Sequence, residues 1–211
     1  MQQVLEKRVI PIVVIENAAS AVPLAEALLK AGQDVVEITF RTPAAPEAVR
    51  EIRRQFPQML VGAGTLLTPE QVDQAVGVGA LFGVSPGLNE KVVARVHAAG
   101  LPMVPGVMTP SEIEKAIELG CKYLKFFPAE PAGGVKMLQA FWGPYSHTGI
   151  KFIPLGGINR MTMTNYLALP GVAAIGGSWM VEKKLIAAQD WKQIETLTRD
   201  ALAAAAAVKK A

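Results

Sequence analysis

The chain has 211 residues, of which 51% are hydrophobic and 18% are charged. This composition is typical of a folded globular protein rather than a disordered one, and the length suits one domain. The net charge of +3 is spread without blocks of like charge, so we expect no nucleic-acid partner. No run approaches the roughly 20 apolar residues of a membrane span, so we expect no membrane partner.

Cys121 is the single cysteine of the chain, so no internal disulfide can form. This favours a reducing, cytoplasmic location. No signal-peptide pattern is recognisable, because the apolar stretch that follows Arg8 is short and ends before Glu16. Two histidines and one cysteine provide no metal-ligand spacing, so we expect no bound metal.

Short apolar runs alternate with helical patterns along the chain. The apolar runs predict strands at residues 10–15, 35–40, 59–63, 81–84, 101–104, 123–127, 151–155 and 172–175. Helices are expected at 18–31, 45–55, 89–99, 135–141 and 190–209, and two more begin at the threonine–proline pairs 68–69 and 109–110.

The alternation of strands and helices predicts a parallel sheet covered by helices. Eight such units predict an α/β protein made of a single (β/α)8 TIM barrel over residues 1–211, near the short end of the size range for that fold. An open, doubly wound sheet is the alternative. No G-x-G-x-x-G motif follows the first strand to support it.

Lys125 is the most informative residue, because it interrupts the apolar run 123–128. A buried ammonium group is costly unless it is paired or neutral, and desolvation lowers the pKa of a lysine. A neutral lysine amine is a nucleophile that forms Schiff bases with carbonyl compounds. The alternative is a lysine near a strand end, with a buried stem and a solvated amine.

Strand residues alternate between the two faces of a sheet, and barrel strands bury one face in the barrel interior. In segment 35–41, this alternation directs Glu37, Thr39 and Arg41 inward. The same rule directs Lys125 inward from the sixth strand. We therefore predict that Glu37, Arg41 and Lys125 meet inside the barrel, with Arg41 at the C-terminal mouth where barrel active sites lie.

This set of residues suits carbonyl chemistry on an anionic substrate. The lysine can form an imine, the carboxylate can transfer protons, and the arginine can bind a carboxylate with two hydrogen bonds. The alternative is a structural ion pair that fills the core, although buried pairs are often no more stable than apolar replacements.

Glycines follow the last two predicted strands. Gly156 and Gly157 come after the seventh strand, and Gly176, Gly177 and Ser178 after the eighth. In many barrels the loops after these strands bind phosphate through backbone N–H groups. Glycine lets the backbone approach the phosphate oxygens, although ordinary tight turns also use glycine. We therefore expect a phosphate site at this end of the mouth.

Several segments together resemble the 2-keto-3-deoxy-6-phosphogluconate (KDPG) aldolases, which also act as 4-hydroxy-2-oxoglutarate (KHG) aldolases. They stand in the order found in that family, at residues 36–42, 61–65, 85–87, 105–107, 125–130, 156–158 and 175–179. The resemblance extends from about residue 10 to the C-terminal helix. It implies a class I aldolase on a (β/α)8 barrel that needs no metal or other cofactor and usually forms a homotrimer.

The resemblance also implies roles for individual residues. Lys125 would form the Schiff base with pyruvate, and Glu37 would act as general acid and base. Arg41 and Thr65 would bind the carboxylate of pyruvate, while Phe127 would pack beside the imine. Pro86 and Leu155 would contact the rest of the substrate. The phosphate would bind to Gly156, Gly157, Gly177 and Ser178.

One residue departs from the pattern of the gluconate-specific members, which resemble P-T-G-G-I after the seventh strand. Here Leu155 replaces the threonine, which is tied to stereochemical choice, and galactonate-type relatives carry an apolar residue there. Leu155 shares its parity with Ile153, so it should point into the mouth without a hydroxyl for the substrate. Either epimer or a different aldehyde could then be accepted; the alternative is unchanged specificity.

We therefore expect cleavage of KDPG to pyruvate and glyceraldehyde 3-phosphate, with cleavage of KHG to pyruvate and glyoxylate as a second candidate reaction. One rival is another phosphate-binding barrel enzyme, such as an isomerase or a thiamine-phosphate-type synthase, which would not need Lys125 as an imine former. The other rival is a phosphoester-binding scaffold without catalytic activity.

Overall fold

The structure is a computed structural model that describes residues 1–209. Within these residues the strands pair only in parallel, in a six-stranded sheet of order β5-β4-β3-β2-β1-β9 and a three-stranded sheet of order β6-β7-β8. The strands are β1 (Val9–Val13), β2 (Val35–Thr39), β3 (Leu60–Gly64), β4 (Phe82–Val84), β5 (Met103–Val104), β6 (Gly106–Val107), β7 (Tyr123–Phe126), β8 (Lys151–Pro154) and β9 (Ile175–Gly177).

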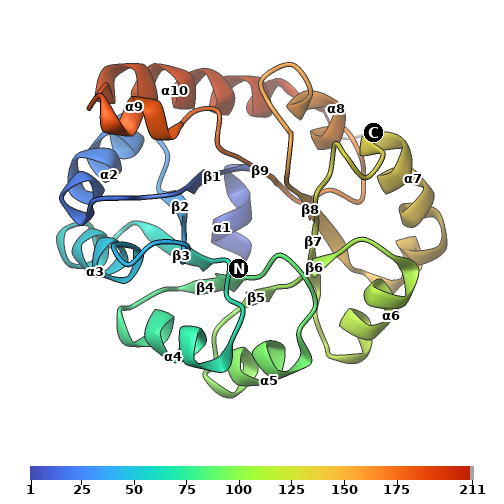
Figure 1. The fold of residues 1–211 in the computed structure, drawn as a ribbon. Coiled ribbons are helices and arrows are strands. Elements are labelled where there is room, and N and C mark those ends of the chain that lie inside the picture. The colour runs from blue at the N-terminus through green and yellow to red at the C-terminus, as the bar shows by residue number, and fades with distance from the viewer. Residues whose placement is uncertain (210–211) are drawn as a thin grey trace.

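Helices surround the strands, except for α1, which lies inside the ring that the others form (Figure 1). The outer helices are α2 (Ala21–Lys30), α3 (Ala45–Gln55), α4 (Pro69–Gly77), α5 (Glu90–Ala98), α6 (Pro110–Glu118), α7 (Gly134–Tyr145), α8 (Met163–Leu167), α9 (Lys183–Ala187) and α10 (Trp191–Ala207). The short α8 and α9 were not predicted. None of the helices in the described part of the chain is long and apolar enough to cross a membrane.

The two predicted threonine–proline helix starts are confirmed. The Thr68 hydroxyl accepts a hydrogen bond from the backbone N–H of Gln71 at the start of α4. At the start of α6, Thr109 and Glu112 form a reciprocal capping box. Such caps satisfy N–H groups that have no partner within the helix, and each stabilises the helix by about 1 kcal/mol.

The strand predicted at 101–104 is found as β5, and a further strand that was not predicted, β6, follows Pro105, which has no N–H to donate. The residues before Pro105 form β5 and pair with β4, whereas those after it form β6 and pair with β7. The carbonyl oxygen of Pro105 accepts a hydrogen bond of 2.8 Å from the backbone N–H of Lys125. The six-stranded and three-stranded sheets therefore meet at this proline.

The sheets also approach each other beside β8. Phe152 forms an isolated parallel bridge with Val172, and its N–H donates to the carbonyl of Gly171 at 2.8 Å. The predicted eighth strand was placed at 172–175, but the regular strand begins at Ile175 and Val172 forms only this bridge. The chain thus has an α/β fold with a curled, parallel sheet.

The buried apolar residues form two clusters that follow the alternation of the strands. Val36 and Ile38 of β2 belong to the larger cluster, which includes the buried faces of the surrounding helices. Val35 of the same strand belongs to the smaller cluster, which the strands enclose. In β7, Leu124 packs in the larger cluster and Tyr123 against the smaller one. The inward and outward faces predicted for these strands are confirmed.

Helix α1 (Gln2–Glu6) was not predicted from the sequence. Its Val4 is only 4% exposed and belongs to the enclosed cluster, with Met1 and Leu5 packed against it. Ile10 and Val35, from the beginnings of β1 and β2, belong to the same cluster. Helix α1 therefore covers the N-terminal end of the strands and leaves the C-terminal end for a site.

Candidate active site

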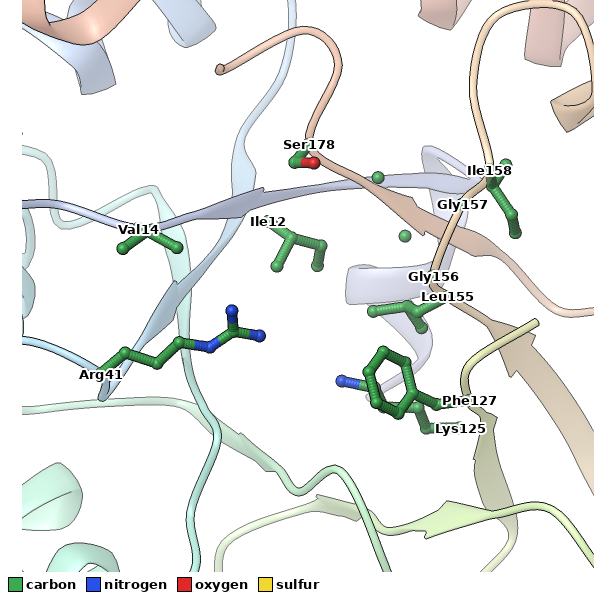
Figure 2. A pocket seen from close by; sticks show the side chains of 12 residues that line it. Ile12, Val14, Arg41, Lys125, Phe127, Leu155, Gly156, Gly157, Ile158 and Ser178 are labelled. Atoms are coloured by element: carbon green, nitrogen blue, oxygen red, sulfur yellow. The ribbon is translucent and has the colours of Figure 1, made fainter. Parts of the chain in front are cut away.

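A pocket of about 160 Å³ opens at the C-terminal ends of β1, β2, β7, β8 and β9. Figure 2 shows the amine of Lys125 and the guanidinium of Arg41 extending into it from opposite sides. The pocket is lined by Ile12, Val14, Arg41, Lys125, Phe127, Leu155, Gly156, Gly157, Ile158, Gly176, Gly177 and Ser178.

Lys125 is 4% exposed and comes from the inward face of β7. Its Nζ lies 4.7 Å from the centroid of the Phe127 ring. Burial is the main cause that lowers the pKa of Lys125; Glu37 opposes this effect, and the charge of Arg41 adds to it. Because a lower pKa enlarges the fraction of neutral amine at a given pH, the site favours a nucleophilic lysine.

Glu37 lies deeper than the pocket. It is 2% exposed and lines a smaller cavity below, whose wall shares Ile12, Leu155 and Gly176 with the pocket. Burial raises the pKa of Glu37, although the charges of Lys125 and Arg41 oppose the rise. For both Glu37 and Lys125, burial is the largest effect and favours the neutral form. Burial thus moves the pKa of the carboxyl group and that of the amine toward each other, which suits groups that exchange protons during a reaction.

The space for the Glu37 carboxylate is provided by β3. A Cβ atom on Gly64 would lie 2.0 Å from Glu37 Oε1 and 2.7 Å from its Cδ, so a larger residue here would displace this carboxylate. Among the described residues, Oε1 has no hydrogen-bond partner. An unpaired buried carboxylate oxygen is costly for folding, and such groups concentrate at functional sites.

Thr65 orients Arg41. The Nε of Arg41 donates a hydrogen bond of 3.3 Å to the Thr65 hydroxyl oxygen. The backbone of Thr65 has a φ of 60°, in the left-handed region that β-branched residues rarely adopt. Such strain persists only where the surrounding structure enforces it, and it is concentrated at ligand sites. Thr65 itself does not line the pocket.

The opposite end of the pocket is formed by backbone. Gly156 and Gly157 have φ values of 98° and 84°, which favour glycine. Within residues 1–209, the N–H groups of Gly156, Gly157 and Ser178 donate to no other protein group. These donors and the Ser178 hydroxyl, which borders the pocket, suit an anion such as phosphate.

Leu155 forms an apolar part of the wall. Its side chain is 5% exposed, lines both cavities, and belongs to the enclosed cluster together with Ile153. Gly176 makes room for it, because a Cβ there would lie 2.6 Å from Leu155 Cδ2. The inward direction predicted from strand alternation is confirmed.

The pocket brings together most of the residues that the sequence proposed for the site. The members that line it are Arg41, Lys125, Phe127, Leu155, Gly156, Gly157, Gly177 and Ser178. Glu37 and Thr65 contribute from outside its wall, as described above. Pro86 does not line it; its carbonyl oxygen instead packs where a side chain of Gly106 would be, 2.0 Å from a Cβ at that position.

Three other lining residues were not proposed from the sequence: Ile12, Val14 and Ile158; Gly176 was named only as part of the glycine pair after the eighth strand. The alternation rule applied to the first strand would have found Ile12 and Val14, whereas no local signal marks Ile158. In the described part of the chain, no group of three or more His, Cys, Asp or Glu residues is arranged to hold a metal ion.

The fold and pocket define a class: parallel α/β proteins with a buried lysine and a buried carboxylate at the C-terminal ends of their strands. A sequence model of the KDPG and KHG aldolase family matches residues 1–197. The 2-dehydro-3-deoxy-phosphogluconate aldolase of Haemophilus influenzae is 45% identical over 205 residues, which are 95% of this chain and 96% of the relative. The chain belongs to the KDPG and KHG aldolase family.

Two further relatives bear on chemistry, one through the two activities in its name and the other through a covalent intermediate in its structure. The KHG/KDPG aldolase of Escherichia coli strain K12 is 42% identical over 194 residues, covering 92% of this chain and 90% of the relative. The KDPG aldolase of Legionella pneumophila has a crystal structure with pyruvate captured at low pH as a covalent carbinolamine intermediate. It superposes with a TM-score of 0.90 at 40% identity, covering 94% of this chain and 96% of the other.

Proposed function

We propose that this chain is a class I aldolase that cleaves KDPG into pyruvate and glyceraldehyde 3-phosphate. The observation that carries the proposal is Lys125, a buried amine with a lowered pKa that opens into a pocket facing Arg41. Membership of the family and the covalent pyruvate intermediate of the Legionella relative support it.

The first half of the reaction builds the Schiff base. The neutral Nζ of Lys125 attacks the C2 ketone of the substrate and forms a carbinolamine. Glu37 supplies the proton with which the C2 hydroxyl leaves as water, and an iminium ion results. Arg41, oriented by Thr65, binds the substrate carboxylate and places C2 beside the amine. The Phe127 ring packs beside the imine.

The second half breaks the carbon–carbon bond. Glu37 accepts the proton of the C4 hydroxyl, and the C3–C4 electrons move into the iminium, which becomes an enamine. Glyceraldehyde 3-phosphate leaves with C4 as its aldehyde carbon. The enamine is then protonated at C3, and water hydrolyses the iminium to release pyruvate and the free amine of Lys125. The iminium accepts the electrons, so this mechanism requires no metal or other cofactor.

The phosphate of the substrate binds at the backbone end of the pocket. Gly156, Gly157 and Ser178 offer N–H groups, and the Ser178 hydroxyl adds a further donor. Gly177 has no side chain, so its backbone can approach the phosphate closely. A site for phosphate here and a carboxylate at Arg41 would hold the substrate by its two anionic ends, with its reacting carbons near Lys125.

The identity of the aldehyde product depends on Leu155. KHG, which would give pyruvate and glyoxylate, is a second candidate substrate, and the dual activity named for the E. coli relative supports it. Because Leu155 presents no hydroxyl to the substrate, we propose relaxed or galactonate-type stereospecificity at C4.

We propose further that the two sheets close into one (β/α)8 barrel that spans the chain as a single domain. The contacts at Pro105 and between Phe152 and Val172 support closure at both junctions. The family resemblance supports a homotrimer, which sedimentation of the purified protein would test. A cytoplasmic location is proposed with it; the buried, free Cys121 agrees with a reducing compartment.

The proposed reaction is tested by incubating the purified chain with KDPG in the presence of a chelator and measuring both products. We expect equal amounts of pyruvate and glyceraldehyde 3-phosphate. The galactonate epimer, assayed in parallel, reports the stereospecificity. A non-aldolase phosphate-binding protein would release neither product and would not exchange the C3 hydrogens of pyruvate in deuterated water, and that pair of results would refute the proposal.

A further inference from the structure

Tyr166 of α8 is among the largest fully buried side chains of the molecule, and the proposed mechanism does not use it. It is 0% exposed, and its hydroxyl donates a hydrogen bond of 2.6 Å to Glu130 Oε1. Gly134 leaves room for this hydroxyl, since a Cβ at residue 134 would lie 3.3 Å from it. The bond joins residues 36 positions apart in the sequence. Because its acceptor is a carboxylate, it is stronger than a hydrogen bond between neutral groups.

Burial, followed by the hydrogen bond to Glu130, raises the pKa of Tyr166 well above its usual value. The hydroxyl therefore keeps its proton throughout the physiological range and remains a donor. Glu130, which accepts this hydrogen bond through Oε1, is itself an exposed residue.

Glu130 is in turn attached to the glycine loop after β8. Its backbone N–H donates to the carbonyl oxygen of Gly156 at 2.9 Å, and the N–H of Ala129 donates to that of Leu155 at 2.7 Å. The stem of Glu130 also packs behind Gly157, where a Cβ would lie 2.7 Å from Glu130 Cβ. Glu130, whose side chain is held by Tyr166, therefore supports Gly156 and Gly157.

The same loop packs against the residue beside the reactive lysine. A Cβ on Gly156 would lie 3.1 Å from the Phe127 ring, so that ring covers the backbone of Gly156. The loops after β7 and β8 thus form one unit, and Tyr166 connects this unit to α8. Without the Tyr166 hydroxyl, the Glu130 side chain loses this hydrogen bond. Lys125 lies on the regular strand β7, so its position does not depend on that bond.

We propose that Tyr166 is a positioning residue for the phosphate end of the substrate, acting through Glu130 to hold Gly156 and Gly157 in their anion-binding conformation. The inference rests on the proposed aldolase function. Removing the Tyr166 hydroxyl should therefore weaken the binding of a phosphorylated substrate. The reaction with pyruvate, which has no phosphate, should keep its rate.

The test compares Tyr166→Phe with the unaltered chain in two assays. We expect KM for KDPG to rise about tenfold, the effect of one hydrogen bond to a charged acceptor, while the exchange of pyruvate C3 hydrogens in deuterated water stays within about twofold of the original rate. Tyr145→Phe is the matched control, since Tyr145 donates a 3.0 Å hydrogen bond to Glu114 away from the pocket. It should leave both assays unchanged.

Glu130 variants test the same bond from the exposed partner, and they remain informative if Tyr166→Phe does not fold. Glu130→Leu should reproduce the selective rise in KM. Glu130→Gln keeps an acceptor oxygen for Tyr166 and should restore most of the affinity. A normal KM in both Tyr166→Phe and Glu130→Leu, or an equal loss in both assays, would overturn the positioning role. Absence of exchange in the unaltered chain would instead refute the proposed aldolase, and this inference with it.

Discussion

Replacing Gly64 by alanine should impair catalysis by displacing one carboxylate. The new Cβ would lie 2.0 Å from Glu37 Oε1, about 1.4 Å closer than ordinary van der Waals contact begins. The obstructing atoms belong to the end of a flexible side chain, so the fold can accommodate the methyl group if the Glu37 carboxylate moves by about this distance. A displacement of roughly 1 Å at a reacting group can cost about 10²-fold in rate.

We therefore expect Gly64→Ala to lower kcat for KDPG cleavage by roughly 10²-fold, similar to the loss expected for Glu37→Gln when a general acid and base is removed. The assay is steady-state cleavage, with thermal unfolding measured on the same samples. Because both substitutions impair the same group, the Glu37 carboxylate, Gly64→Ala should have little further effect on kcat in a chain that already carries Glu37→Gln.

Gly62→Ala provides the contrasting control on the same strand. Its Cβ would lie 2.2 Å from the ring of Phe82, which is buried and cannot move aside. We expect a loss of about 1–3 kcal/mol in the free energy of unfolding from overpacking. Normal kcat in folded Gly64→Ala would refute the argument, because Glu37 would then not depend on its observed position.

Three further predictions concern charge, specificity and stability. The exchange of pyruvate C3 hydrogens begins with the neutral amine of Lys125, so its rate should rise with pH through the pKa of this group and level off below 10.5, its unshifted value. A profile still rising at pH 10.5 would contradict the lowered pKa of Lys125. Leu155→Thr adds a hydroxyl to the pocket wall and should change the ratio of kcat/KM for the two C4 epimers about five- to tenfold; an unchanged ratio would remove Leu155 from substrate discrimination. The double variant Lys125→Met, Glu37→Leu should be inactive yet about 1–4 kcal/mol more stable in chemical denaturation, since two buried ionisable groups, one with an oxygen that lacks a hydrogen-bond partner among the described residues, give way to apolar side chains; lower stability would show that these two groups support the fold.

The inward placement of the catalytic candidates could be predicted because strand alternation is a local property. In segment 35–41 the polar residues occur at every second position from Glu37 onward, and the same strand alternation applied to the run 123–128 directs Lys125 inward. The structure places the apolar partners of Glu37 and Lys125 under the helices and these two side chains within the enclosed interior. Knowing the direction of a side chain did not require knowing its neighbours.

Contacts between strands could not be predicted in the same way. Gly64 makes room for Glu37 only because β3 pairs with β2 in one register, which aligns Thr39 with Gly64. A shift of one residue would place Ala63 there instead. The hydrogen bond between Tyr166 and Glu130 likewise joins elements whose approach depends on the loops after β7 and β8.

Short elements were missed for a different reason. Helix α1 has five residues, too few to display the helical period, and its Val4 acquires significance only when it meets Ile10 and Val35 inside the ring of strands. Strand β6 has only two residues, and its separation from β5 at Pro105 depends on the pairing of each with a different neighbouring strand.

The central claim is that Lys125 forms a Schiff base with pyruvate. The most direct measurement is to incubate the chain with pyruvate, reduce it with borohydride, and locate the added mass by peptide mass spectrometry. We predict one reduced pyruvate unit, on Lys125. A matched control is Lys151→Gln, because Lys151 also lies 4.7 Å from an aromatic ring centroid, that of Trp142, yet outside the pocket; this variant should still form the adduct. No adduct, or an adduct on another lysine, would contradict the account.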